Sequence, residues 1–446
     1  MKQRTIAALA VLPCLGLCIT TQLQAEPIKE VVENILKTNP DVLASTSHRR
    51  SADEEVKVAK GGYFPRVDLI LGYGRERTDD PTTRRAGLDS KTLTRRENGL
   101  ALRQMLFDGF GVSSEVDRQK GRLNSSAYLA YGASEQISLN AVDAYLEVLR
   151  QQELVSLAKQ NLDNHQRAYD QIQLRSSGGL GRKADIDQVQ SRLSLAKSNL
   201  LAVESTLKDA ETKYRYVVGS SPKDLTKPPI PENLLPKNET EAIETAVNSH
   251  PILKSALADV ETAQAQHKAA KSLLYPRLDL DLSAARNSDL DGVEGDYNTT
   301  QAMLRLRYNL FNGQSDSARV DQTSLLTREA TEISNRSRRQ VEQATKMSWN
   351  AYSTAGERLT PLKDFTIASE ATRDAYAKQF SLGQRTLLDL LDSENEYYTA
   401  RTSYVTGEYT QLSAAYRLLQ NEGRLLESLG VPLPEEAIAP SSEKSK

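Results

Sequence analysis

The sequence repeats itself once, and this duplication constrains the fold more than any other feature. The segment Tyr63–Leu69 recurs 211 residues later as Leu274–Leu280, and Leu102–Gly109 recurs at an offset of 204 as Leu306–Gly313. The offset falls to 202 in the last part of each half, which indicates a shorter early loop in the second half. We therefore predict two copies of one structural unit, at residues 26–219 and 241–430. A linker with five prolines at 220–240 joins them, and residues 431–446 are predicted to form a disordered tail.

The first 25 residues differ from the rest of the chain. Lys2 and Arg4 precede a mostly apolar run, Ile6–Ile19, which ends shortly before Glu26. This pattern predicts a secretory signal peptide, since the run is too short to span a membrane. Both cysteines lie inside it, so the mature chain would contain no disulfide. Whether Cys18 carries a lipid stays open.

Each half follows the same plan. A polar helix of about 33 residues is predicted at Ile28–Lys60 and again at Glu241–Ser272, because Pro65 and Pro276 then stop helical structure. Two strands with alternating apolar and polar residues follow, joined by polar loops at about 76–96 and 287–299. The apolar class is typical of a face toward lipid and the charged class of a watery lumen, but a soluble half-buried sheet would show the same alternation.

Long helices follow the strands in both halves. One is predicted at Val112–Arg175, and its counterpart at Gln314–Gln379 is predicted to be broken only by Pro361. Short glycine-containing turns lead into return helices. The first return helix has apolar residues at alternating spacings of three and four, which indicates left-handed pairing of helices. These positions are Ile186, Val189, Leu193, Ala196, Leu200, Val203, Leu207, Ala210, Tyr214 and Val217. The equivalent second seam is softened by Asn395 and Thr402.

Helix lengths and strand number constrain the assembly. A return helix and the first helix of the next unit together match one long helix, so we expect two short helices to line each long one. Four strands cannot close a membrane barrel, and open sheet edges are not tolerated in lipid. If the strands lie in a membrane, copies of the chain must close one barrel together, with eight strands from two copies or twelve from three.

The second turn carries a specific motif. Phe380–Asp392 (FSLGQRTLLDLLD) closely resembles the tip of the TolC family of outer-membrane efflux and secretion channels, and the duplication and the endings Leu106–Gly109 and Leu310–Gly313 resemble it too. The resemblance implies a mainly α homotrimer with a twelve-stranded barrel in outer-membrane lipid and a twelve-helix barrel across the periplasm. It also implies a periplasmic adaptor and an inner-membrane pump, either ABC-type or proton-driven. The segment Arg103–Gly109 favours type I protein secretion over drug efflux.

The resemblance also implies a gate at the periplasmic end. Asp389 and Asp392 would form carboxylate rings around the pore, and Arg385 would pair with Asp187 of the neighbouring chain. Phe380 stands where the family has a tyrosine, and Ser176 where it has a glutamine, so the closed state is expected to be weaker. The turns themselves are expected to contact the adaptor, through Gly178, Gly179, Leu180, Gly181, Leu382 and Gly383. Alternatively, all four charges are solvated helix-end residues and the glycines serve only the turns.

Other function classes find little support. The four histidines lie scattered on helical stretches and are expected to be solvated rather than metal ligands. The acidic loop Asp289–Asp296 lacks the spacing of a calcium loop. No phosphate-binding glycine loop or catalytic serine or cysteine motif is present, and a net charge of -2 without a basic stripe argues against nucleic acid. We predict no enzymatic activity and no cofactor. A soluble periplasmic coiled-coil adaptor or scaffold is the alternative.

Overall fold

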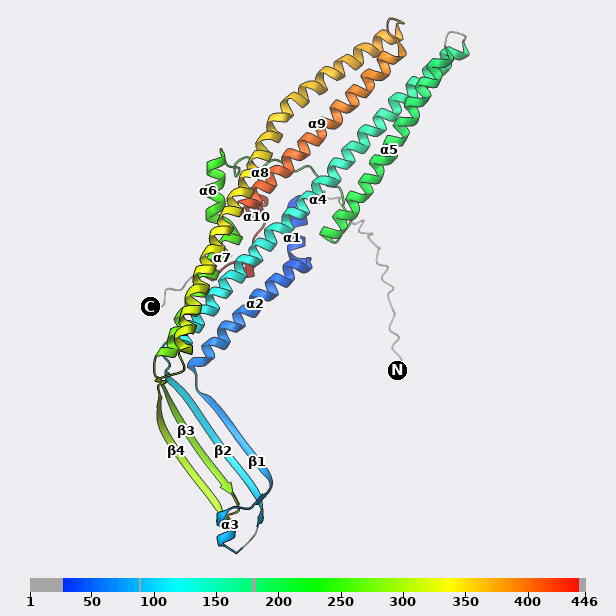
Figure 1. Cartoon of the computed structure of the whole chain (residues 1–446). Helices are drawn as coiled ribbons and strands as arrows, with labels where there is room; N and C mark the ends of the chain where they lie inside the picture. The colour runs from blue at the N-terminus through cyan, green and yellow to red at the C-terminus, as the bar shows by residue number, and fades with distance from the viewer. Residues whose placement is uncertain (1–26, 88–89, 179–181, 441–446) are drawn as a thin grey trace, which may run out of the picture.

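The computed structural model describes residues 27–87, 90–178 and 182–440. The molecule is elongated, with long helices at one end and a four-stranded sheet at the other (Figure 1). The predicted signal peptide lies outside the described residues. No helix in the described ranges is long and apolar enough to cross a membrane.

Apart from the short helices α3 and α10, the two halves have the same order of elements, as the duplication predicts. The first half contains α1 (Ile28–Thr38), α2 (Pro40–Lys60), β1 (Arg66–Thr78), α3 (Pro81–Arg85), β2 (Lys91–Phe107), α4 (Gly111–Ser177) and α5 (Lys183–Val218). The second half contains α6 (Glu239–Ser249), α7 (Pro251–Lys271), β3 (Arg277–Ser288), β4 (Asp296–Arg307), α8 (Ser315–Ser381), α9 (Leu387–Asn421) and the short α10 (Leu425–Leu429). The sequence alone did not indicate α3, which lies in the predicted loop between the first two strands.

The single first helix predicted for each half is wrong, because a proline divides it in two. Pro40 begins α2, and Asn39 before it has an extended backbone and accepts a hydrogen bond from the Asp41 amide at 2.9 Å. Pro251 begins α7 in the same way, after His250. Proline lacks the N–H that a helix interior needs but suits a first turn, so each break is also a helix start.

The long helices α4 and α8 have 67 residues each, which corresponds to about 100 Å at 1.5 Å per residue. The predicted break at Pro361 is wrong, since α8 runs through that residue without interruption. Figure 1 shows α5 beside one end of α4 and α2 beside the other, and α9 and α7 divide α8 in the same way. Helix α7, the first helix of the second unit, also packs along α4, as expected. In the second half, however, the short helix that extends α9 along α8 is α7 of the same unit, and α2 packs against α4 instead.

The predicted seam of α5 is buried or half-buried at all ten positions. In the second seam, Leu388 and Asn395 are exposed and the other eight positions are buried or half-buried. The main core lies midway along the molecule, where α1, α4, α5, α9 and α10 meet. Small residues permit close helix contacts in this core and between it and the sheet. A Cβ added to Gly121 of α4 would lie 2.4 Å from the Thr262 hydroxyl of α7.

The four strands form one antiparallel sheet in the order β1-β2-β3-β4. They extend into both ends of the two predicted loops, so the strands are longer than expected. The register aligns apolar residues on one face, with Leu69 opposite Leu100 and Leu280 opposite Leu304. In the part of the sheet nearer the helices, the other face carries the charged residues, among them Asp279, Asp281 and Arg305. The predicted alternation is therefore confirmed, and the apolar face is largely exposed in the single chain.

The charged face is held together by ion pairs across strands. Asp281 accepts hydrogen bonds from Arg103 and Arg305 at 2.8 Å each. Asp279, which has no exposed surface, lies 3.0 Å from Arg277 and 2.9 Å from Arg307. A carboxylate buried among side chains needs such cationic partners, so these contacts keep the charges on one face of the sheet.

The tail predicted to be disordered is partly ordered. Val431 and Ala437 are buried, and Glu436 forms an ion pair with Arg50 of α2. Residues 441–446 lie outside the described residues. The linker is also held in place, because the Tyr145 hydroxyl of α4 donates to the Thr226 carbonyl and accepts from its amide, both at 2.8 Å.

Candidate functional site

The last turn of α4, the start of α5 and the turn between α8 and α9 lie at the end of the molecule farthest from the sheet (Figure 1). Gly178 caps α4 with φ of −83°, which any residue adopts. Gly179, Leu180 and Gly181 lie outside the described residues. At the second turn Leu382 is 72% exposed, and Gly383 has φ of +75° with open space around its Cα. Gly383 is therefore required by its backbone conformation rather than by a close neighbour.

Asp389 takes part in a capping box at the start of α9. The Thr386 hydroxyl accepts from the Asp389 amide, and the Asp389 carboxylate accepts from the Thr386 amide at 3.1 Å. The hydroxyl also donates to this carboxylate at 2.8 Å, and these hydrogen bonds lower the pKa of Asp389. Within one chain, then, Asp389 stabilises a helix start, as the structural alternative supposed.

Arg385 is positioned by its own hairpin. Its Nε donates to Gln379 at 3.0 Å, its guanidinium lies 4.1 Å from the centre of the Tyr376 ring, and its nearest carboxylate oxygen is that of Asp389 at 3.9 Å. Asp187 is exposed on α5 and forms no ion pair with another described residue. A single chain does not bring Arg385 and Asp187 together.

Asp392 has a partner that the sequence did not predict. Its Oδ1 accepts from Nη2 of Arg192 at 3.1 Å, and this ion pair connects α9 of the second hairpin to α5 of the first. The two residues lie at nearly equivalent positions of the two return helices. No spacing within either helix marks this contact, because it depends on how the two hairpins meet.

Phe380 joins the two hairpins through apolar contacts. It is buried in a cluster with residues of both hairpins, among them Ile172 of α4 and Val189 of α5. The Arg175 guanidinium lies 4.7 Å from the centre of the ring, within range of a cation–π interaction. Where the family's tyrosine would supply a hydroxyl, this chain buries an apolar ring between its hairpins.

Buried polar groups continue this contact below the tips. Glu394 of α9 accepts from the Asn164 amide of α4 at 2.8 Å, and burial raises the pKa of Glu394. His165, next to Asn164, is buried, and its pKa is lowered by burial and by Arg192. His250 is also buried, with its pKa lowered to about 4. The expectation that all four histidines are solvated is therefore wrong for these two.

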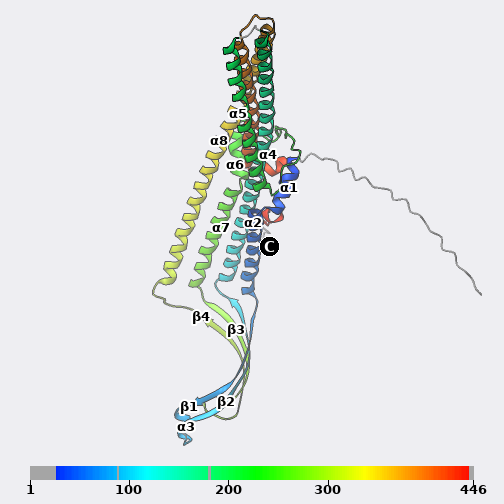
Figure 2. The same cartoon turned by 90° about the vertical axis from the view of Figure 1, so that its right-hand side faces the viewer.

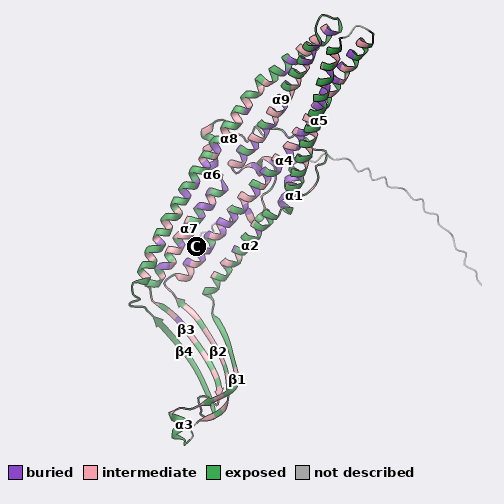
Figure 3. Ribbon diagram, turned by 45° about the vertical axis from the view of Figure 1, so that its right-hand side comes forward, coloured by how far each residue is buried: buried purple, intermediate pink, exposed green. Residues whose placement is uncertain are grey.

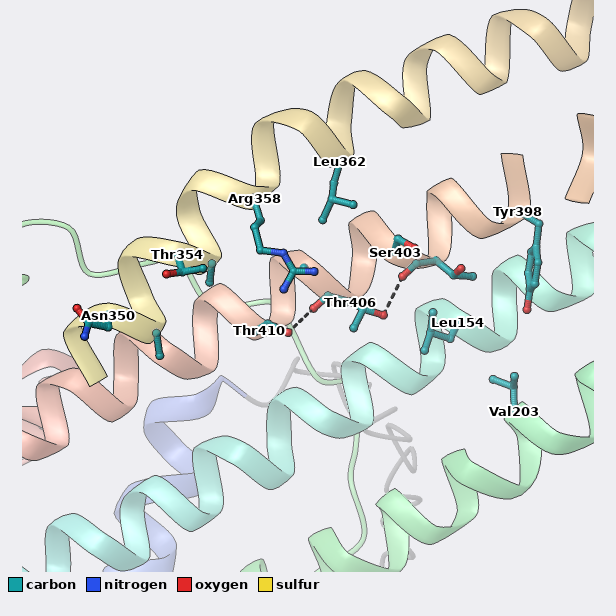
Figure 4. A pocket seen from close by; sticks show the side chains of 14 residues that line it. Leu154, Val203, Asn350, Thr354, Arg358, Leu362, Tyr398, Ser403, Thr406 and Thr410 are labelled. Carbon is teal, nitrogen blue, oxygen red and sulfur yellow. Dashed lines mark hydrogen bonds between the residues drawn. The ribbon is translucent and has the colours of Figure 1, made fainter. Parts of the chain in front are cut away.

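A cavity of about 890 Å³ opens between the hairpins midway along the helices, as Figure 4 shows. Its wall includes Thr402, Thr406 and Thr410 of α9, and the latter two hydroxyls donate to backbone carbonyls of α9. Arg358 is the single charged residue among its lining side chains in the described ranges. The lining includes serine and threonine hydroxyls, but no carboxylate or histidine that could act as a base lies among the described lining residues.

Metal binding finds no support among the described residues, which hold no group of histidine, cysteine or acidic side chains that could bind an ion. In the acidic loop, Asp289 accepts from the Gly295 amide at 3.1 Å and Asp291 pairs with Arg95 at 3.2 Å. These carboxylates therefore shape a turn between strands.

Two buried glutamates near the main core were not predicted. Glu135 of α4 accepts from the amides of Leu425 and Leu426 at 3.0 and 3.2 Å, at the start of α10, and burial raises its pKa to about 8. Glu422, at the end of α9, is fully buried, and its carboxylate has no hydrogen-bond partner among the described residues. Burial raises its pKa to about 7. No spacing or motif marks either residue, because their burial depends on the helix junctions.

Comparison with known proteins identifies the family. The family model described as "Outer membrane efflux protein" matches residues 31–220 and 242–424. The chain is 27% identical to the outer membrane efflux protein BepC of Brucella suis, over 90% of this chain and 86% of BepC. It is 25% identical to the outer membrane protein TolC of Salmonella enteritidis, over 95% of this chain and 89% of TolC. It is 24% identical to the protease secretion protein PrtF of Dickeya chrysanthemi, over 91% of this chain and 89% of PrtF.

Solved structures agree on the fold. The outer membrane channel CmeC of Campylobacter jejuni superimposes with a TM-score of 0.77 at 14% identity, covering 89% of this chain and 86% of that one. The family model covers both repeated halves, and the fold combines the sheet with long helical hairpins. The chain belongs to the outer membrane efflux protein family and is an outer-membrane channel of the TolC type.

Proposed function

We propose that three copies of this chain close one continuous channel through the outer membrane and the periplasm. The free sheet edges carry this proposal. Strands β1 and β4 are the outer strands of the sheet and are largely exposed in the single chain (Figure 3). Pairing β4 of one copy with β1 of the next would satisfy the open edges that lipid does not tolerate. Three copies then give twelve strands, the number that the resemblance to TolC implies.

The helical part has matching free edges. Figure 2 shows α8, α7, α4 and α2 side by side in one layer, continuous with the sheet. Large apolar side chains are exposed on the outer helices, including Leu201 and Tyr216 of α5 and Met347 and Ile367 of α8. Contacts between copies would remove this surface from water, and each Å² of apolar surface buried would stabilise the assembly by about 25 cal/mol.

In this assembly the channel exports proteins or small molecules as the outer-membrane part of a tripartite system, without enzymatic activity of its own. A periplasmic adaptor would contact the turns, and an inner-membrane pump would supply the energy. The relatives are named for both efflux and protease secretion. The segment Arg103–Gly109 favours type I secretion. Membership of an outer-membrane family argues against the soluble adaptor alternative.

The gate is the finer part of the proposal. Threefold symmetry would place six carboxylates, from Asp389 and Asp392, around the pore axis at the tips. Arg385 of one chain would reach Asp187 of the next, since Asp187 is exposed and forms no ion pair with a described residue of its own chain. That pair would hold neighbouring hairpins together in the closed state.

Mass measurement of the purified protein in mild detergent tests the assembly. We expect a mass of three chains and ion-conducting channels in planar bilayers. A monodisperse monomer that conducts would contradict the cyclic assembly, and a dimer would contradict the number of copies. Crosslinking in cells, followed by identification of the co-purifying adaptor, would then distinguish type I secretion from efflux.

A further inference from the structure

The end of the sheet away from the helices carries unpaired arginines on its apolar face. Tyr73 lies opposite Arg96 in the register of β1 and β2. Arg75 and Arg77 follow Tyr73 at a spacing of two, so they share its face. Arg96 lies opposite Ser288, which places Arg286 on this face as well. All four arginines are exposed.

Arginines on the two faces of the sheet differ in their partners. On the charged face, Arg103 and Arg305 pair with Asp281, and Arg95 pairs with Glu76 and Glu97. On the apolar face, none of the four arginines forms an ion pair with a described residue, a set that omits Leu88 and Asp89. The arginines of the charged face therefore have carboxylate partners, and the four arginines of the apolar face have none among the described residues.

Few carboxylates share the apolar face with these arginines. Asp79, at the end of β1, binds Arg84 at 2.8 Å. Asp296 lies opposite Ser288 at the start of β4 and forms no ion pair with another described residue. The apolar face therefore has a net positive charge at the end of the sheet away from the helices.

The arginines lie just beyond the apolar band of the sheet. This band includes Val67, Leu69, Leu71 and Tyr73 on β1. Because a strand rises about 3.3 Å per residue, Arg75 lies about 7 Å beyond Tyr73 and Arg77 about 13 Å beyond it. Arg96 also has its guanidinium 6.0 Å from the centre of the Tyr73 ring. An aromatic ring followed by cations is the arrangement expected where hydrocarbon meets headgroups.

We propose that this row, Arg75, Arg77, Arg96 and Arg286, binds the phosphate groups of anionic glycolipids in the outer leaflet. The helices extend into the periplasm, so the opposite end of the sheet faces the cell exterior. Guanidinium groups bind phosphate through paired charge-assisted hydrogen bonds, and the apolar band beneath contacts the acyl chains of the same lipid. The inference rests on the membrane barrel proposed above.

Native mass spectrometry of the purified trimer with added lipid A tests this proposal. The test variant replaces all four arginines by glutamine. A matched control replaces four exposed arginines of α8 by glutamine, at Arg328, Arg336, Arg338 and Arg339. We expect lipid A retention to fall about fivefold for each arginine lost from the row, in line with the contribution of a basic residue near an anionic membrane surface. The α8 control should retain lipid A like the parent.

Two further probes identify the ligand. Dephosphorylated lipid A, which keeps the acyl chains, should bind the parent as weakly as lipid A binds the test variant. Inorganic phosphate at millimolar concentration should not displace lipid A, because it lacks acyl chains. Equal lipid A retention by parent and test variant would overturn the proposal, as would equal binding of the dephosphorylated lipid or displacement by inorganic phosphate. Loss of the trimer in the parent itself would instead contradict the proposed assembly.

Discussion

Nη2 of Arg192 lies 3.1 Å from Oδ1 of Asp392, and this ion pair connects the two helical hairpins of one chain close to their tips. The contact crosses between the repeated halves, so it can form only when the hairpins lie side by side. Both side chains are partly exposed, and such a pair contributes about 0.2–1 kcal/mol to stability. Its effect should therefore appear in the relative position of the hairpins more than in the free energy of unfolding.

Replacing Arg192 by methionine should loosen the hairpins near the tips. Spin labels at Gln190→Cys and Glu396→Cys would report the distance between α5 and α9, since both native cysteines lie in the predicted signal peptide. We expect a broader distance distribution for the variant, because the ion pair to Asp392 is lost. Electron spin resonance measures this distribution.

A matched control removes an ion pair that lies within one helix. Lys57 and Glu54 of α2 are 2.7 Å apart, and Lys57→Met removes this pair without altering either hairpin. The distance distribution of the control should match that of the parent. Identical distributions in all three proteins would show that the Arg192 contact does not position the hairpins.

The proposed gate should control ion selectivity. Carboxylates crowded around a pore axis attract cations, so Asp389→Ala combined with Asp392→Ala should lose cation preference and block by divalent cations. Single-channel recording in planar bilayers measures both. Because Asp389 also caps α9, Asp389→Asn with Asp392→Asn is the control that keeps a side-chain acceptor at the cap. If selectivity persists in both double variants, these residues do not form the constriction.

Arg385→Ser should raise the conductance of the closed channel. The proposed ion pair to Asp187 of a neighbouring chain would be lost, so the tips would separate more easily. Asp187→Ser should have the same effect, and the double variant should add little, since both changes remove one interaction. Additive increases in conductance would indicate that the two residues act separately.

The second turn should be sensitive to substitution in two separate ways. Leu382→Glu places a charge on a side chain that is 72% exposed, so the trimer should remain folded while adaptor binding is lost. Gly383→Val forces a branched residue to φ of +75° and should lower stability by about 1–2 kcal/mol. Export assays and adaptor crosslinking measure the first effect, and thermal unfolding measures the second. Leu174→Glu, on an equally exposed residue of α4, is the control for added charge.

The duplication and the periodicity predicted the repeated plan, the seam of α5 and the alternation of the sheet, because each depends on local spacing. The sequence analysis predicted one continuous helix across Pro40 and another across Pro251. Each proline instead begins a new helix, because proline suits the first turn of a helix although it disrupts the interior. Contacts between the halves were not predictable from periodicity. The pairing of Arg192 with Asp392 and the burial of Glu422 depend on how distant helices meet, and no short motif encodes that.

The buried glutamates predict a pH dependence of stability. Burial raises the pKa of Glu422 to about 7, against 4.5 for an ordinary glutamate, with Arg424 and Glu241 as the nearby charges. A raised folded-state pKa means that the folded protein binds the proton more tightly than the unfolded chain. The contribution of Glu422 to stability is therefore fully present below about pH 4.5, decreases as the pH rises toward 7, and is lost above it, a change of about 3 kcal/mol per chain. Glu422→Gln should remove this part of the decline in urea unfolding at pH 5 and pH 8, while Glu135, whose pKa is raised to about 8, continues to contribute. Glu396→Gln, on an exposed residue of α9, should leave the decline unchanged. A Glu422→Gln protein with the parent's full pH dependence would show that Glu422 does not change its charge on unfolding.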